Sequence, residues 1–86
     1  MTATQKLVVE LLLQGHNIAM YRNGPSRVRN ENNEVVKVVN TRTVSAIRSL
    51  LRKEKSGLLV IDKNKVRQLN GNCIAKKMYK ALSNGK

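Results

Sequence analysis

The chain has 86 residues, of which 41% are hydrophobic, so it can form one small core but not two. Seventeen Lys and Arg residues against five Asp and Glu residues give a formal net charge of +12. No apolar run is long enough to cross a membrane, no signal peptide is evident, and a single cysteine excludes an internal disulfide. We therefore expect one domain over residues 1–86 in the cytoplasm, nucleoid-associated if it binds DNA.

The positive charge is concentrated in the second half of the chain. Residues 1–40 contain five bases and three acids, whereas residues 41–86 contain twelve bases and two acids. This asymmetry is typical of nucleic-acid-binding proteins, and an acidic protein surface is the second candidate partner. Double-stranded RNA is a further alternative. Proteins that bind single strands usually stack the bases on aromatic side chains, and this chain has only two tyrosines, which argues against single-strand binding. An exposed Tyr21 beside Arg22 would make single-strand binding a candidate again.

The first half of the chain predicts one helix followed by strands. Residues 4–14 are apolar around most of a helix, with Leu7, Val8, Leu11 and Leu12 on one wide stripe. Such a helix is central to the core or shared with a partner subunit. Gly15 is placed to end this helix. A small antiparallel meander is predicted at residues 17–22, 26–30 and 35–39, with residues 27–34 left open between strand and loop. Candidate phosphate contacts in this region are Arg22, Arg27 and Arg29.

Residues 41–55 predict an amphipathic helix with a basic face. At 100° per residue, Val44, Ile47 and Leu51 fall on one side, and Leu50 and Ala46 extend this apolar stripe. The other side is basic and hydroxylated, with Arg42, Ser45, Arg48, Ser49, Arg52 and Lys53. Because arginine presents a planar fork of donors, this face suits phosphates and base edges. The plainer alternative is a helix whose basic side chains only face solvent.

Residues 58–69 predict a β-hairpin with a turn at residues 62–65. Lys63 and Lys65 would lie at its tip and Arg67 on its second strand, where they suit the phosphate backbone beside a groove. A final helix is predicted at residues 73–83, and its buried side would consist of Ile74, Ala75, Met78, Tyr79, Ala81 and Leu82. Its outward lysines are candidates for secondary phosphate contacts, namely Lys76, Lys77 and Lys80.

Nothing in the sequence indicates catalysis or a metal site. His16 has no potential ligand at metal-binding spacing, and Cys73 has no neighbouring base to activate it. The five acids are scattered over different predicted elements. We therefore expect a protein that is not an enzyme and that needs no cofactor or metal.

The order of helix, strands, basic helix and hairpin resembles the winged-helix variant of helix-turn-helix DNA-binding domains. The residues that carry the resemblance are Thr41, Val44, Ile47, Leu50 and Leu51, then residues 57–60, 62–65 and 66–69. It implies a winged-helix-like α+β fold with three helices and one or two antiparallel hairpins. Helix 41–55 would enter the major groove, and hairpin 58–69 would lie on the backbone as a wing. A standard winged helix has another helix where this chain has predicted strands.

The early strands look more like a group of small bacterial winged-helix-like proteins that act as toxins against DNA topoisomerase. The first resemblance implies a small double-stranded-DNA-binding protein, as a transcriptional regulator or a phage or mobile-element accessory factor. The second implies a non-enzymatic inhibitor that grips a nucleic-acid-processing protein through its basic face. Since one short helix reads few base pairs, a homodimer is a candidate state for the DNA-binding form.

Overall fold

The computed structural model describes residues 2–84, with side chains through Leu82. These residues form four α-helices, one short 3-10 helix and five strands, so the expected α+β class is confirmed, although the helix count of three is not. The helices are α1 (Ala3–Leu13), α2 (Thr41–Ala46), η1 (Arg48–Leu50), α3 (Lys63–Arg67) and α4 (Ile74–Asn84). The strands are β1 (Asn17–Ala19), β2 (Ser26–Arg29), β3 (Val35–Val39), β4 (Leu51–Lys53) and β5 (Leu59–Ile61).

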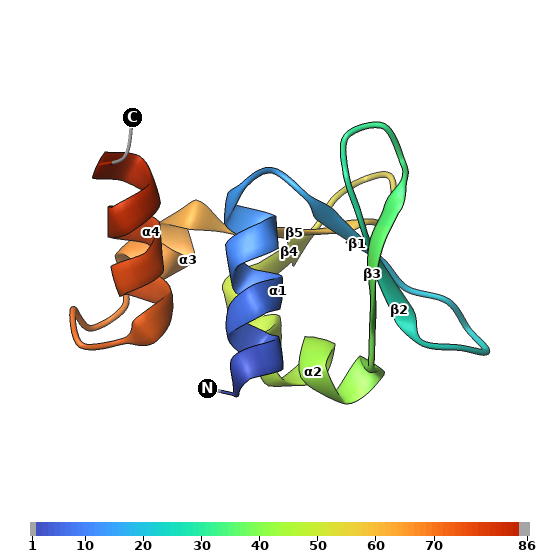
Figure 1. The fold of residues 1–86 in the computed structure, drawn as a ribbon, viewed down its shortest axis with the longest axis horizontal. Coiled ribbons are helices and arrows are strands. Elements are labelled where there is room, and N and C mark those ends of the chain that lie inside the picture. Colours follow the sequence, from blue (N-terminus) through green and yellow to red (C-terminus); the bar gives the residue numbers. More distant parts are fainter. Residues whose placement is uncertain (1, 85–86) are drawn as a thin grey trace.

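The strands form one antiparallel sheet in the order β3-β2-β1-β5-β4, rather than two separate hairpins (Figure 1). The early meander β1–β2–β3 was predicted from its β-branched residues and turns. The second hairpin, β4–β5, joins it through the pairing of β1 with β5. Ile18 of β1 lies opposite both Val28 and Leu59, and all three side chains are buried. The middle of the sheet is therefore also the middle of the core.

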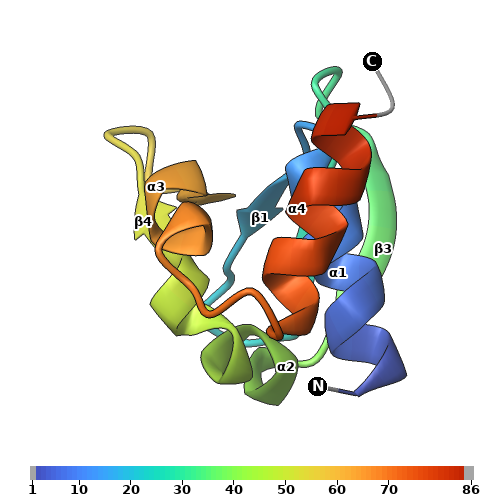
Figure 2. The ribbon, with the colours of Figure 1, turned by 90° about the vertical axis from the view of Figure 1, so that its left-hand side faces the viewer.

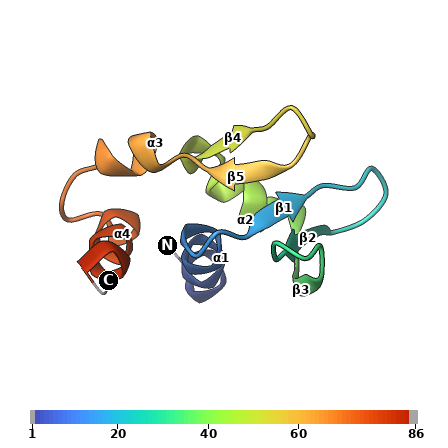
Figure 3. The same cartoon turned by 90° about the horizontal axis from the view of Figure 1, so that it is seen from above.

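Helix α1 is the predicted first helix, and its ends form as its sequence indicates. Thr2 and Gln5 make a reciprocal capping box at its start, and Gly15 follows its end with φ of 104°. The buried side chains are Val8, Val9 and Leu12, whereas Leu7, expected on the buried stripe, is 42% exposed. Helix α1 packs against α2, α4 and β5, and it lies beside α4 in Figures 2 and 3. It is thus central to the core.

The predicted helix at residues 41–55 is wrong beyond its first half. Asn40 caps α2 through its side chain, but the helix ends at Ala46, and residues 51–53 form strand β4. Residues 47–55 are rich in Leu, Arg, Lys and Glu, which are good helix formers, so local helix propensity does not explain why the helix ends at Ala46. The observed path buries both Leu50 and Leu51 and gives β5 a second neighbour in the sheet. Ala46, expected at the edge of the apolar stripe, is exposed.

The predicted hairpin at residues 58–69 is also wrong. Its first strand exists as β5, but the residues expected to form the turn and the returning strand form helix α3 instead. Asp62 is the reason, because its carboxylate accepts hydrogen bonds from the backbone N–H groups of Asn64 and Lys65, at 3.0 and 3.4 Å. Helix α3 then buries Val66. The hairpin in this part of the chain is β4–β5, with its turn at residues 54–58.

Helix α4 confirms the final predicted helix. Ala75 is fully buried, and Ile74, Met78, Tyr79 and Leu82 are half-buried, as the apolar stripe indicates. Ala81, expected on the same side, is exposed. Cys73 is half-buried against the core, in line with its expected role as a small packing residue. One core cluster joins the helices and the sheet.

The turn of the β4–β5 hairpin depends on glycine at position 57. Gly57 has φ of 88°, in the left-handed region that costs an L-residue about 1–2 kcal/mol. Gly57→Ala is therefore expected to lower the free energy of unfolding by about 1 kcal/mol, measured by urea denaturation. Gly24→Ala is the matched control, since Gly24 has no positive φ and no atom within 4 Å of an added Cβ. Equal losses for the two variants would contradict this account.

Candidate functional site

The segment from α2 to α3 exposes a continuous series of cations, which we call the basic segment (residues 41–65). It contains seven bases and two acids. All seven basic side chains are exposed: Arg42, Arg48, Arg52, Lys53, Lys55, Lys63 and Lys65. The buried residues between them, among them Val44, Ile47 and Leu50, fix the backbone of this segment to the core. The exposed cations are therefore presented from an anchored backbone rather than from a loose tail.

The predicted basic helix face is divided among three elements. Arg42 and Ser45 lie on α2, Arg48 and Ser49 on η1, and Arg52 and Lys53 on β4. All six side chains are exposed, so the separation of polar from apolar residues was predicted correctly. The prediction that one helical surface presents these six side chains together is wrong, because the helix ends before Ile47.

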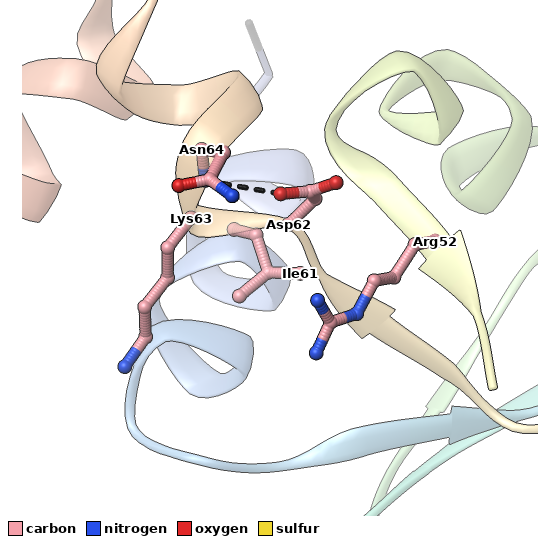
Figure 4. Close-up of a pocket in the computed structure, with 5 residues that line it drawn as sticks. All are labelled: Arg52, Ile61, Asp62, Lys63 and Asn64. Carbon is pink, nitrogen blue, oxygen red and sulfur yellow. Dashed lines mark hydrogen bonds between the residues drawn. The ribbon is translucent and has the colours of Figure 1, made fainter.

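Arg52 and Lys63 are brought together by the fold. Both line a hollow of about 220 Å³, with Ile61, Asp62 and Asn64 completing its wall (Figure 4). In that view the two cationic side chains extend from β4 and α3 with Ile61 between them. The carboxylate in this wall, Asp62, is already engaged as the cap of α3. An adjoining hollow of about 170 Å³ shares Arg52 and Lys63 and adds His16 and Glu54.

The other predicted wing cations lie on α3 rather than on a hairpin. The Lys65 ammonium donates to the backbone carbonyl of Leu51 at 3.1 Å, which ties α3 to β4. The Arg67 guanidinium donates to the side chain of Asn64. The β4–β5 turn carries Lys55 instead, a residue that was not selected from the sequence as a contact. Lys55 could be identified as a candidate contact only once the position of the hairpin turn was known.

The three lysines of α4 differ from one another. Lys77 and Lys80 are exposed, as expected for outward-facing residues. Lys76 is half-buried, and its ammonium donates to the carbonyls of Arg67 and Leu69 at 2.6 and 3.0 Å. The Arg67 carbonyl ends α3 and the Leu69 carbonyl lies just beyond it, where a cation is favoured by the helix dipole. Lys76 therefore has a structural partner, which weakens its case as a phosphate contact.

A second group of cations surrounds Tyr21 at the other end of the sheet; we call Tyr21, Arg27 and Arg29 the Tyr21 cluster. The Arg27 and Arg29 Cζ atoms lie 4.7 and 5.6 Å from the centroid of the Tyr21 ring, within cation–π range. Arg29 also donates from Nη2 to the Tyr21 hydroxyl. The sequence offered both arginines as candidate phosphate contacts, but it did not indicate that they share one aromatic ring.

Among the described residues, no group of three or more His, Cys, Asp or Glu side chains is arranged to hold a metal ion. None of the helices in residues 2–84 has the length and apolar content that crossing a bilayer requires. The chain matches no family model, no curated protein and no solved structure. Any assignment of function therefore depends on the charge and geometry described above.

Proposed function

We propose that this protein binds double-stranded DNA through the basic segment. The observation that carries the proposal is the exposure of all seven bases in residues 41–65, on elements anchored to one core. Lysine and arginine side chains that neutralise phosphates release condensed counterions, which supplies most of the affinity for DNA. The two acids of the segment, Glu54 and Asp62, reduce its positive charge but do not reverse it.

In this proposal the domain binds DNA as a winged helix does, but the residues that form the groove-facing helix and the wing differ from those expected from the sequence. Helix α2 with η1 lies toward the major groove and offers Arg42, Ser45, Arg48 and Ser49 to base edges and phosphates. The β4–β5 hairpin, not residues 58–69, is the wing, with Arg52, Lys53 and Lys55 as its cations. Lys63 and Arg67 on α3 would extend the contact along the backbone, and Lys65 would add to it only by leaving the Leu51 carbonyl. The chain order, in which α2 and η1 are followed by the β4–β5 hairpin and then by α3, supports this arrangement.

The competing proposal is an inhibitor that grips an acidic surface on a nucleic-acid-processing protein. The same exposed cations support it, and electrostatic complementarity would guide that encounter as well. Gel retardation of a mixed-sequence duplex at low salt separates the two. A shifted duplex that resists competition by an acidic protein supports DNA binding. No shift at low salt, together with a stable complex on the acidic protein, would favour the inhibitor instead.

A homodimer is part of the DNA-binding proposal, as a means of reading two half-sites. Strand β3 is the sheet edge at which a second copy could add, since Val35, Val36 and Val38 are exposed there. Sedimentation with and without DNA measures this state. Monomer alone under both conditions would remove the dimer while leaving the DNA-binding proposal intact.

A further inference from the structure

We propose that the Tyr21 cluster is a stacking site for an unpaired base of single-stranded nucleic acid. The cluster lies on β2 and on the loop after β1, whereas the basic segment begins at α2. Strands β1 to β3 occupy the end of the molecule farthest from α4 (Figure 1). The inference therefore does not depend on DNA binding by the basic segment, and either site can exist without the other.

The face of the sheet that carries the cluster is directed away from the core. Arg27 and Arg29 flank Val28, which is fully buried, and side chains along a strand alternate between the two faces. Arg27 lies opposite Val38 on β3, whose side chain is 56% exposed. The ring of Tyr21 is thus bordered by two guanidinium groups, one of which belongs to a residue paired with the exposed Val38.

The chemistry of the cluster matches what an unpaired nucleotide requires. Tyr21 is 39% exposed, and an accessible aromatic side chain is the type of group on which any base can stack. Guanidinium groups are planar and charged, so they can stack on bases as well as pair with phosphate. With Arg27 and Arg29 held against the ring, both the aromatic and the cationic contacts are positioned before the ligand arrives.

Arg29 has a donor that lacks an acceptor. Its Nε atom is closed off from solvent and has no hydrogen-bond partner among the described residues, although its Nη2 donates to Tyr21. Buried donors are usually paired, because leaving one unpaired is costly. Nε and Nη2 lie on one edge of the planar guanidinium group, so the two donors can act together as a fork. A phosphate or base oxygen entering beside the ring would supply the acceptor.

The geometry favours a single strand over a duplex. Bases in a duplex are already stacked on their neighbours, whereas an unpaired base is free to lie on an aromatic side chain. Both DNA and RNA supply such bases. Fluorescent oligothymidylate and oligouridylate therefore serve as the two probes, with an abasic deoxyribose-phosphate strand and a duplex as reference ligands.

Tyr21→Leu removes the aromatic ring while keeping an apolar side chain, and Tyr21→Phe keeps the ring while removing the hydroxyl. Tyr21→Leu is expected to weaken binding of oligothymidylate, oligouridylate or both by about 5- to 150-fold, measured by fluorescence anisotropy. Tyr21→Phe should stay within about 3-fold of the unaltered protein. Arg22→Ala is the charge control, because Arg22 is exposed and follows Tyr21 in the sequence but is not one of the two arginines within cation–π range of the ring.

Far-UV circular dichroism and thermal melting establish that each variant is folded. Binding of the abasic strand as tight as that of oligothymidylate would overturn the proposal, because no base would then be recognised. Unchanged single-strand affinity in Tyr21→Leu would also overturn it, as would an equal loss on duplex. Single-strand binding that survives Arg48→Ala with Arg52→Ala but fails in Tyr21→Leu would support a site separate from the basic segment.

Discussion

Replacing both Arg48 and Arg52 with alanine is expected to weaken binding to a preferred duplex by at least about 30-fold. Each arginine that pairs bidentately with a guanine edge contributes about 1–3 kcal/mol of discrimination, and about 1.4 kcal/mol corresponds to tenfold in affinity. Both side chains are exposed and neither residue is part of the core, so the fold should survive. A duplex obtained by footprinting on random DNA fragments, titrated by anisotropy, measures the effect.

The matched control replaces the same two residues with lysine. This variant keeps the charge of the basic segment but removes the planar fork of donors. It should therefore keep most of the affinity for non-preferred duplexes and lose discrimination between sequences. Wild-type affinity in the double alanine variant would show that the basic segment is not the DNA-binding surface.

Ile18→Ala is expected to lower the free energy of unfolding by about 2–5 kcal/mol. Ile18 is 0% exposed and lies in β1, the strand that joins the early meander to the β4–β5 hairpin. A domain of this size is typically stable by about 5–15 kcal/mol, so the loss removes a large part of the total. Urea denaturation followed by circular dichroism measures the difference.

Val38→Ala provides the control for this core variant. Val38 is 56% exposed on the edge strand β3, so its truncation leaves no cavity and should cost less than about 1 kcal/mol. Comparable losses for Ile18→Ala and Val38→Ala would mean that the sheet is not organised around β1. DNA binding by a still-folded Ile18→Ala sample should be unchanged at low temperature, because no basic side chain is altered.

The features that were predictable from the sequence are those decided by short-range interactions. The first helix has Thr2 with Gln5 at its start and Gly15 after its end. The run at residues 35–39 is β-branched at four of its five positions and forms β3. At α1 the local preference agrees with burial of Val8, Val9 and Leu12, whereas β3 forms on its β-branched residues alone, since only Val39 of its four valines is buried.

The prediction of a helix over residues 41–55 was wrong because the spacing of its apolar residues is compatible with two different structures. Leu50 and Leu51 fit the edge of a helical stripe, but they also fit a turn that leads into a buried strand. The deciding factor is the pairing of Leu51 with Ile61 across the β4–β5 hairpin, together with the pairing of β5 with β1. The β1–β5 pairing joins residues about forty positions apart, and no local pattern predicts it.

The prediction of a hairpin at residues 58–69 was wrong because of the role of one residue, Asp62. Asp62 is equally suited to begin a tight turn and to cap a helix. Burial of Val66 by the helix selects the cap. The cap places Lys63 on α3, in the wall of the hollow that Arg52 also lines, whereas the hairpin turn that carries Lys55 follows from the pairing of β4 with β5.

The sequence therefore predicted which cations of the basic segment are exposed, but not which of them lie together. The proximity of Arg52 to Lys63 depends on the path of β4 and α3. The grouping of Arg27 and Arg29 around Tyr21 depends on strand pairing between β1 and β2. Juxtapositions of this kind follow from topology, whereas exposure follows from local polarity.

The most direct test of DNA binding is the salt dependence of duplex affinity for the unaltered protein. If the exposed cations of the basic segment contact phosphates, the logarithm of the binding constant should fall linearly with the logarithm of salt concentration. Contacts from four to seven of these cations correspond to a slope between about −4 and −6. A slope near zero, or no duplex binding even at low salt, would contradict the account.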